Sequence, residues 1–214
     1  MATITLYHGS PNEMVNPTFG LGLDKHDYGR GFYLTLDLQL AKEWAVSRPD
    51  GVSGFVHTFL LETDGLSIVD FERLGSLCWL AELMKHRDAV DSKRYRMLSA
   101  KFVKKYGADT RDADVITGRR ADASYFYIAK AFVRDEVDVD ILPELLSLGG
   151  LGIQWCIKSE KAYSQLKKTD AVMPVDFNEY NAMYNDRDNA ARFKMMELIN
   201  SDKNKVEKVF STLI

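Results

Sequence analysis

Two short apolar segments near the start of the chain each place one polar ring beside a glycine. Residues 6–10 read Leu-Tyr-His-Gly-Ser, and residues 31–35 read Gly-Phe-Tyr-Leu-Thr. Both segments have the alternating pattern of a short β-strand. Glycine at these points lets backbone or a ligand approach closely. The sequence therefore predicts that His8 and Tyr33 lie on neighbouring strands, where they can hold a flat ring and a sugar hydroxyl in a cleft.

The rest of the chain predicts strands, then helices, then strands again. Strands are expected at residues 3–8, 31–35, 54–62, 66–71, 114–118, 153–157 and 171–175. Helices are expected from residue 38, within 71–106, and at 124–134, 141–148, 160–168 and 178–200. Because strands do not alternate strictly with helices, the pattern favours an α+β fold with a mixed or antiparallel sheet. We expect one domain over residues 1–175, with a helical insertion at 71–106 and a C-terminal helical extension at 176–214.

Composition restricts the class of protein. A chain of 214 residues can bury one core, and its formal net charge of −3 argues against a protein that is basic throughout, although a local basic patch stays open. Cys78 and Cys156 lack the spacing of metal ligands and are expected to be buried reduced thiols. No apolar run is long enough for a membrane helix or an export signal. These features predict a cytoplasmic protein with no bound metal and no membrane partner.

Each candidate side chain also has an ordinary structural explanation. His8 could bind a ribose hydroxyl or simply a loop carbonyl. Tyr33 could stack on a heteroaromatic ring or pack in the core. Arg30, between two glycines, could reach a pyrophosphate or be a solvated loop charge. Gln154 opens a strand and could bond a sugar hydroxyl or lie at a surface edge, but an amide cannot act as a general base.

Other motifs are absent or weak. The glycine-rich run at 20–31 is followed by a strand, so it is not a Rossmann fingerprint, and no Walker loop, Ser-His-Asp set or paired carboxylates occur. His57 and Glu62 are interpreted as structural. Two groups carry two interpretations each. The first group is Asp114, Gly118, Ala121 and Asp122, which could form a cleft wall or ordinary turns. The second group is Arg187, Asp188 and Arg192, which could form a solvated helix face or contact a partner or substrate.

Taken together, the segments resemble ADP-ribosyltransferases of the diphtheria-toxin and poly(ADP-ribose) polymerase type. Those proteins carry His in a first strand, Tyr in a second, and an acidic or other residue in a later strand. The chain is similar to a bacterial branch known as a domain of unknown function, in which Leu-Tyr-His-Gly-Ser precedes Asp-aromatic-Gly-basic-Gly-Phe-Tyr-Leu-Thr, matched here by residues 27–35. Segments 114–122 and 154–166 also match, so the resemblance covers residues 3–168.

The resemblance implies a split sheet and an enzyme that uses NAD⁺ as co-substrate. His8 would bond the nicotinamide ribose, the backbone of Gly9 would hold the carboxamide, and Tyr33 would stack on nicotinamide. Gln154 would take the third-strand position, where the polymerases have Glu, so single transfer of ADP-ribose is expected rather than polymer formation. The remaining residues expected to bind NAD⁺ are Ser10, Arg30, Gly31 and Thr35.

The leading hypothesis is a mono-ADP-ribosyltransferase that modifies a protein or nucleic-acid acceptor, as the toxin of a toxin–antitoxin pair with an antitoxin partner or in phage defence. Two alternatives are an NAD⁺ glycohydrolase and a catalytically inactive module that binds NAD⁺ or a partner. A third, transfer of a 2′-phosphate from RNA to NAD⁺, would need several basic residues in the cleft, and the motifs supply only Arg30.

Overall fold

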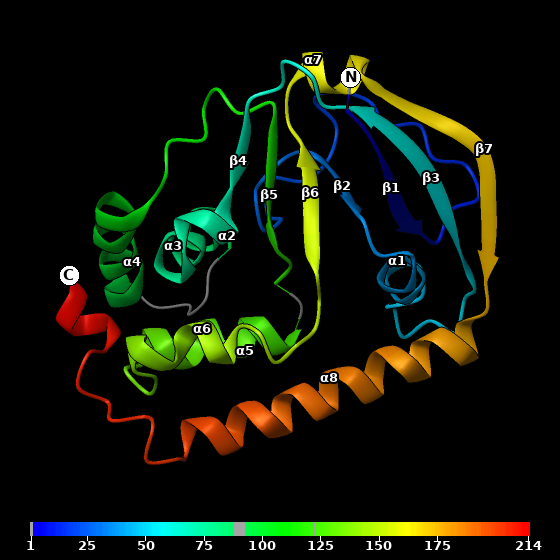
Figure 1. Cartoon of the computed structure of the whole chain (residues 1–214). Coiled ribbons are helices and arrows are strands. Elements are labelled where there is room, and N and C mark those ends of the chain that lie inside the picture. The colour runs from blue at the N-terminus through cyan, green and yellow to red at the C-terminus, as the bar shows by residue number, and fades with distance from the viewer. Residues whose placement is uncertain (1, 88–92, 122) are drawn as a thin grey trace.

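A seven-stranded sheet forms the centre of the molecule in the computed structural model, which describes residues 2–87, 93–121 and 123–214. The strand order is β4-β5-β6-β2-β1-β3-β7 (Figure 1). Their bounds are β1 (Thr3–Ser10), β2 (Phe32–Thr35), β3 (Gly54–Glu62), β4 (Ile68–Asp70), β5 (Val115–Arg119), β6 (Ile153–Ile157) and β7 (Leu166–Val175). β4 and β5 are parallel, and the other neighbouring strands are antiparallel. The expected α+β fold with a mixed sheet is confirmed.

Helices cover both halves of the sheet. The helices are α1 (Leu38–Ala45), α2 (Phe71–Leu74), α3 (Ser76–His86), α4 (Lys93–Tyr106), α5 (Ala123–Val133), α6 (Leu142–Leu145), α7 (Glu160–Ser164) and α8 (Phe177–Ile199), with 3₁₀ turns at Val139–Ile141 and Phe210–Leu213. α1 packs against β1 and β3, whereas α2 to α6 gather around the β4–β5 edge (Figure 1). α8 starts after β7 and runs beneath both halves, touching α1 and α5.

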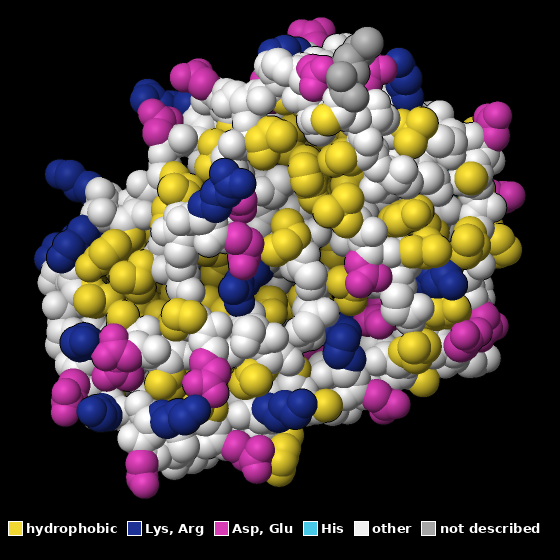
Figure 2. All heavy atoms as spheres, viewed as in Figure 1, with side chains coloured by type: hydrophobic (Ala, Val, Ile, Leu, Met, Phe, Trp, Pro, Cys, Tyr) yellow, Lys and Arg dark blue, Asp and Glu magenta, His cyan; other side chains and the backbone are white. Residues whose placement is uncertain are grey.

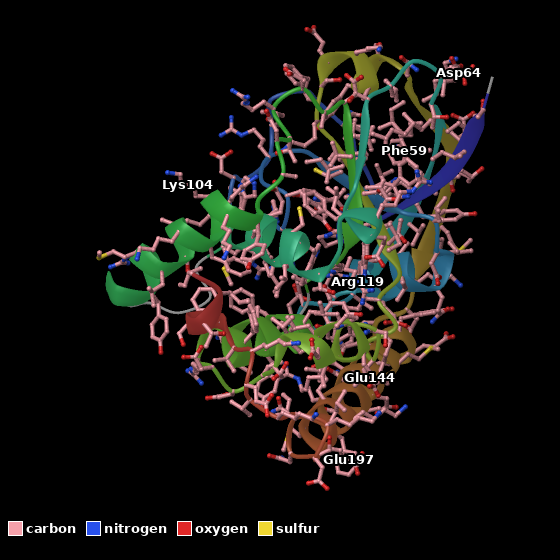
Figure 3. The ribbon with its side chains drawn as sticks, turned by 60° about the vertical axis from the view of Figure 1, so that its left-hand side comes forward. Phe59, Asp64, Lys104, Arg119, Glu144 and Glu197 are labelled. Carbon is pink, nitrogen blue, oxygen red and sulfur yellow. The ribbon has the colours of Figure 1, made fainter. Side chains whose placement is uncertain are left out.

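The largest hydrophobic cluster joins the sheet to segments far apart in the chain. It contains Trp79 of α3, Phe102 of α4, Phe132 of α5, Met195 of α8 and Phe210 of the last turn, all fully buried. The helices at 71–106 and the C-terminal segment therefore share one core. A second cluster on the other side of the sheet surrounds Phe59 of β3, the labelled residue among the strands in Figure 3.

The expected helix at 160–168 is wrong in its second half. α7 ends at Ser164, and β7 begins at Leu166, earlier than the expected strand at 171–175. The cause is pairing with β3, in which Leu166 lies opposite Leu61, because an available strand edge outweighs helical spacing in so short a segment. The expected helix at 141–148 is likewise shorter, since α6 follows a 3₁₀ turn and ends at Leu145.

The cysteines and the surface agree in part with expectation. Both thiols are free; Cys156 is buried as expected, whereas Cys78 is only half-buried. No helix within the described ranges combines the length and apolar character needed to cross a bilayer. Figure 2 shows Lys and Arg interspersed with Asp and Glu over the viewed face, so charge of one sign does not dominate this side of the molecule.

Candidate functional site

The sheet opens between β1 and β2. β1 pairs with β3 along its whole length, from Thr3 opposite Glu62 to Ser10 opposite Phe55. Against β2, by contrast, the register holds one pair, Tyr7 with Thr35. A cavity of about 680 Å³ lies at this opening, and its wall includes His8, Gly9, Gly31, Phe32 and Tyr33. This volume falls within the range of small-molecule sites.

His8 reaches across the opening. Its Nδ1 lies 2.7 Å from the carbonyl oxygen of Tyr33, and a carbonyl oxygen only accepts, so Nδ1 carries the proton. Burial lowers the pKa of His8 to about 4, against the raising effect of this hydrogen bond and with a smaller lowering effect from His57. The ring is therefore neutral near pH 7. Its Nε2 keeps a lone pair, which can accept a hydrogen bond from a hydroxyl group.

Tyr33 is fixed through its hydroxyl group. The hydroxyl donates to the carbonyl oxygen of Gly29 at 2.5 Å and accepts from the backbone nitrogen of Tyr28 at 3.1 Å. Burial is the main cause that raises the pKa of Tyr33 well above its usual value, so the phenol stays protonated. The half-buried ring then lies in the cavity wall, 5.3 Å from the ring of His26 between centroids. Because the hydroxyl is engaged, the ring can contribute its face or edge to a ligand.

The turn before β2 needs its glycines. Gly29 has φ of +70°, a conformation that residues with a side chain rarely adopt. A Cβ on Gly31 would collide with Sγ of Cys156 on β6. Lys158 then fastens the turn, because its Nζ donates to the carbonyl oxygens of Tyr28 at 2.7 Å and Arg30 at 2.6 Å. The two glycines allow the tight turn and the close contact with β6 that together place Tyr33 in the cavity wall.

Gln154 lies on the floor of the same cavity, 3 % exposed, so the surface-edge interpretation is wrong. Its strand position is opposite Thr35. Its Nε2 donates to Oδ2 of Asp27 at 2.9 Å and to the carbonyl oxygen of Arg119 at 3.1 Å. Both partners are acceptors, which assigns the nitrogen to that side of the amide. Oε1 is then the atom that Gln154 can offer to a ligand, as an acceptor.

The carbonyl oxygen of Arg119 joins this floor to the core. It also accepts from the Tyr28 hydroxyl at 2.8 Å and from Nε1 of Trp79 at 3.1 Å. Figure 3 labels Arg119 at the end of β5, where its side chain pairs with Glu72 of α2 at 2.8 Å. The position of Gln154 therefore depends on two buried side chains of the largest hydrophobic cluster, Tyr28 before β2 and Trp79 of α3.

Arg30 does not line the cavity. Its guanidinium is exposed and pairs with Asp24 at 2.9 Å, while a second nitrogen donates to the carbonyl oxygen of Gly20 at 3.3 Å. These contacts hold Arg30 to its own loop. Arg30 is therefore a charged residue of the loop and does not reach into the cavity.

Ser10 and Thr35 also lie outside the cavity wall. Oγ of Ser10 accepts from the backbone nitrogen of Asn12 at 3.1 Å, which closes the turn after β1. Oγ1 of Thr35 donates to the carbonyl oxygen of Ile153 at 3.3 Å and accepts from the backbone nitrogen of Asp37 at 3.1 Å. Both hydroxyls therefore serve the local backbone.

Gly9 has two surroundings. It lines the cavity, and a Cβ at this position would collide with the carbonyl oxygen of Ala41 and approach the backbone nitrogen of Ala45 to 2.7 Å. α1 begins at Leu38 because Asp37 caps its first turn, with Oδ1 of Asp37 accepting from the backbone nitrogen of Gln39 at 2.8 Å. Glycine here is required by the packing of α1 on β1, whatever its backbone contributes to a ligand.

Sequence reasoning missed Asp27, the buried carboxylate beside Gln154. Its Oδ1 accepts from Nη1 of Arg87 at 2.7 Å, and its Oδ2 accepts from the backbone nitrogen of Ala121 at 2.8 Å. Arg87 follows α3 and Ala121 precedes α5, so the contacts join parts that no local pattern connects. The one available signal was that Asp27 opens the matched motif at residues 27–35.

Two further arginine–aromatic pairs line the cavity. The guanidinium carbon of Arg87 lies 4.7 Å from the ring centroid of Phe126, and that of Arg120 lies 4.2 Å from the centroid of Trp44. Such pairs combine cation–π attraction with apolar burial. Tyr184 of α8 completes this side of the wall. These residues come from five separate segments, which explains why the sequence did not reveal them.

The first of the weaker groups is divided by the structure. Asp114 lies outside the cavity wall and fastens the start of α7, accepting from Oγ of Ser159 at 2.5 Å and from the backbone nitrogen of Ser67 at 2.8 Å. Gly118 provides room for the Tyr28 hydroxyl, and Ala121 lines the cavity. Asp122 lies outside the described residues.

The interpretation of Arg187 and Asp188 as part of a solvated face is wrong. Nε of Arg187 lies 2.8 Å from Oε2 of the buried Glu43, and this pair ties α8 to α1. Asp188 is buried and pairs with Arg192 at 2.7 Å. His57 is structural as interpreted, because it is buried and its Nε2 lies 3.0 Å from the carbonyl oxygen of Asn12.

A comparison with protein families matches residues 4–168 to the family described as "Protein of unknown function (DUF3990)". The chain belongs to this family. The DUF3990 match runs from β1 into β7, so it includes His8, Asp27, Tyr33 and Gln154, while Tyr184 lies beyond it. No curated protein matches the chain, and no solved structure does either. The cavity is thus built mainly from the part of the chain that defines the family.

Proposed function

We propose that this DUF3990 protein transfers a single ADP-ribose unit from NAD⁺ to a macromolecular acceptor. The observation that carries the proposal is that His8 and Tyr33, on two strands that part from one another, line one cavity. Both rings are neutral, and each is oriented by a hydrogen bond at the atom that a ligand does not need. The resemblance in sequence to ADP-ribosyltransferases points to the same pair.

In this proposal the two rings bind the nicotinamide end of NAD⁺. Nε2 of His8 accepts a hydrogen bond from a hydroxyl of the nicotinamide ribose, and the ring of Tyr33 stacks on nicotinamide. The bond between C1′ and the nicotinamide nitrogen breaks, and its electron pair leaves with nicotinamide. A nucleophilic atom of the acceptor bonds to C1′, and its proton passes to solvent. The rings contribute by orienting the dinucleotide for this step.

Gln154 limits the reaction to one transfer in this proposal. Its amide hydrogens are engaged by Asp27 and Arg119, so Oε1 can accept from a ribose hydroxyl but cannot remove its proton in the useful pH range. Extension of a polymer requires activation of a hydroxyl on ADP-ribose already attached. Without a base at this position, we expect the product to carry single units.

The test uses the purified full chain with NAD⁺ labelled in its adenine part and a bacterial lysate. Wild type is expected to label a macromolecule, and His8→Ala and Tyr33→Ala are expected to lower labelling at least 100-fold. Tyr127→Ala is the matched control, since Tyr127 is an exposed residue of α5 outside the cavity wall. Protease and nuclease treatment of the labelled product separates protein from nucleic-acid acceptors. Equal labelling by wild type and both cavity variants would contradict the proposal.

Two other outcomes identify the alternatives. Release of nicotinamide at the same rate with and without lysate, with no labelled product, would indicate a glycohydrolase. NAD⁺ binding by calorimetry with no release would indicate an inactive binding module. A role as the toxin of a toxin–antitoxin pair predicts that expression arrests bacterial growth and that His8→Ala abolishes the arrest.

A further inference from the structure

Asp27 is the one carboxylate among the described residues that line the cavity, and the mechanism above does not use it. Its side chain is buried, at 6 % exposure for the residue, beside the ring-binding residues. Burying a carboxylate is costly unless its oxygens are hydrogen-bonded. Hydrogen bonds to both oxygens of Asp27 offset that cost.

Three donors from three different segments orient this carboxylate. Nη1 of Arg87 binds Oδ1 at 2.7 Å, while Nε2 of Gln154 and the backbone nitrogen of Ala121 bind Oδ2 at 2.9 and 2.8 Å. Each partner supplies a hydrogen, so each contact requires an oxygen that accepts. The arrangement therefore suits a carboxylate anion, fixed in place before any ligand enters.

The charge of Asp27 acts on the Tyr33 side of the cavity. Asp27 directly precedes Tyr28, whose backbone nitrogen donates to the Tyr33 hydroxyl at 3.1 Å. After burial and the neighbouring Cys156, the negative charge of Asp27 is a further cause that raises the pKa of Tyr33. Gln154, which binds Asp27 directly, lines the same wall. The carboxylate thus lies in the wall beside Tyr33 and Gln154, and in the proposed function Oε1 of Gln154 accepts from a ribose hydroxyl.

The proposed reaction needs a negative charge at that place. When nicotinamide leaves with the electron pair of the C1′–N bond, positive charge moves onto C1′ and the ring oxygen of the ribose. A fixed anion beside such a centre stabilises it, as carboxylates do in glycosyl transfer. Gln154 is neutral and cannot supply this charge.

We propose that Asp27 is the anion that stabilises the ribosyl cation and that Gln154 is a positioning residue for it. This inference rests on the proposed function and deepens it. The carboxylate forms no bond to C1′. The acceptor forms that bond, as described above, and Asp27 remains ionised throughout. The alternative is that Asp27 is only a structural link between Arg87, Ala121 and Gln154.

The test compares three variants by nicotinamide release in the presence of the bacterial lysate, by NAD⁺ binding and by thermal unfolding. Asp27→Asn should lower kcat for release at least 100-fold while the dissociation constant for NAD⁺ changes less than tenfold. Asp27→Asn with Gln154→Glu puts a carboxylate at the residue that contacts position 27. Its kcat for release should be at least tenfold higher than that of Asp27→Asn alone. Asp27→Asn with Arg87→Met removes both charges, leaves no unpaired buried charge, and keeps the test valid if the single variant fails to fold.

The matched control is Glu43→Gln. Glu43 is also a buried carboxylate paired with an arginine, Arg187 at 2.8 Å, but it is not part of the cavity wall. Its loss should lower the unfolding temperature without lowering kcat. The inference is overturned if Asp27→Asn with Arg87→Met releases nicotinamide within threefold of the wild-type rate, or if adding Gln154→Glu to Asp27→Asn does not raise the rate of release. A wild-type chain that releases no nicotinamide overturns the proposed function and this inference together, whereas an active wild type with an active Asp27 variant overturns the inference alone.

Discussion

His8 and Tyr33 are joined directly across the opening in the sheet, because Nδ1 of His8 donates to the carbonyl oxygen of Tyr33 at 2.7 Å. The backbone of one strand therefore sets the orientation of a ring carried by the other. A shift of β2 relative to β1 would turn the imidazole and move the tyrosine together. The two rings thus behave as one unit, which gives them a shared geometry before a ligand binds.

Acid should weaken the fold through His8. Its pKa is about 4 in the folded chain against 6.5 for an ordinary histidine, so the unfolded chain takes up the proton first. The stability that His8 contributes is complete above pH 6.5 and is lost as pH falls from about 6.5 to about 4, on the order of 2 kcal/mol for a partly exposed residue. Urea unfolding of wild type and His8→Gln across this range measures the difference.

Titration of every group other than His8 affects wild type and His8→Gln alike, so its effect on stability cancels in that comparison. Burial also lowers the pKa of His57, which is present in both proteins, so only the difference between their curves reports on His8. Parallel curves for wild type and His8→Gln would show that the imidazole is not held neutral by the fold.

The hydroxyl and the ring of Tyr33 should have separable effects. Tyr33→Phe keeps the ring but leaves the carbonyl of Gly29 and the backbone nitrogen of Tyr28 without their partner. We expect it to lose about 1–3 kcal/mol of unfolding free energy and to keep measurable NAD⁺ turnover. Tyr33→Ala should abolish turnover. Denaturant titration and nicotinamide release are the two measurements, and a Tyr33→Phe protein as inactive as Tyr33→Ala would place the chemistry in the hydroxyl instead.

The sequence predicted the parts of the site that depend on local pattern. Alternation and glycine placed His8 and Tyr33 on strands, and the same pattern placed Gln154 at the start of β6. The link between Asp27 and Gln154 spans 127 positions, and that between Asp27 and Arg87 spans 60. Such contacts arise from the order of strands and from how helices pack, which residue spacing along one segment does not contain.

The predictions that proved wrong, for one element and for two arginine side chains, failed because contacts outside the local pattern decided the structure. Helical spacing at 160–168 was real but short, and pairing of β7 with the free edge of β3 decided the structure there. Arg30 sits between two glycines, a pattern compatible with a phosphate contact, yet Asp24 in its own loop binds it. Arg187 occupies a polar position in the helix sequence, but α1 covers it with Glu43. For β7 and Arg187 the deciding partner is remote in the chain, whereas for Arg30 it lies six positions away in the same loop.

Gly9 should tolerate no side chain. A Cβ would enter the space of the Ala41 carbonyl oxygen, which is backbone and cannot rotate away. We expect Gly9→Ala to destabilise the protein by about 3 kcal/mol, because α1 must move off β1. Gly20→Ala is the control: its φ is +80° but no atom lies within 4 Å of an added Cβ, so about 1 kcal/mol is expected from backbone strain alone. Equal losses in chemical denaturation would contradict the close packing of α1.

The C-terminal helix should be part of the folding unit and not an appendage. Met195 and Met196 are neighbours on α8, but Met195 is fully buried in the main cluster and Met196 is 49 % exposed. Met195→Ala should cost about 2–5 kcal/mol, whereas Met196→Ala should cost less than about 0.5 kcal/mol. Because Met195 packs in the same cluster as Trp79 and Phe132, Met195→Ala should lower the midpoint of one unfolding transition shared by the whole chain. A separate early transition in Met195→Ala, with the main one unchanged, would show instead that α8 folds independently of the sheet.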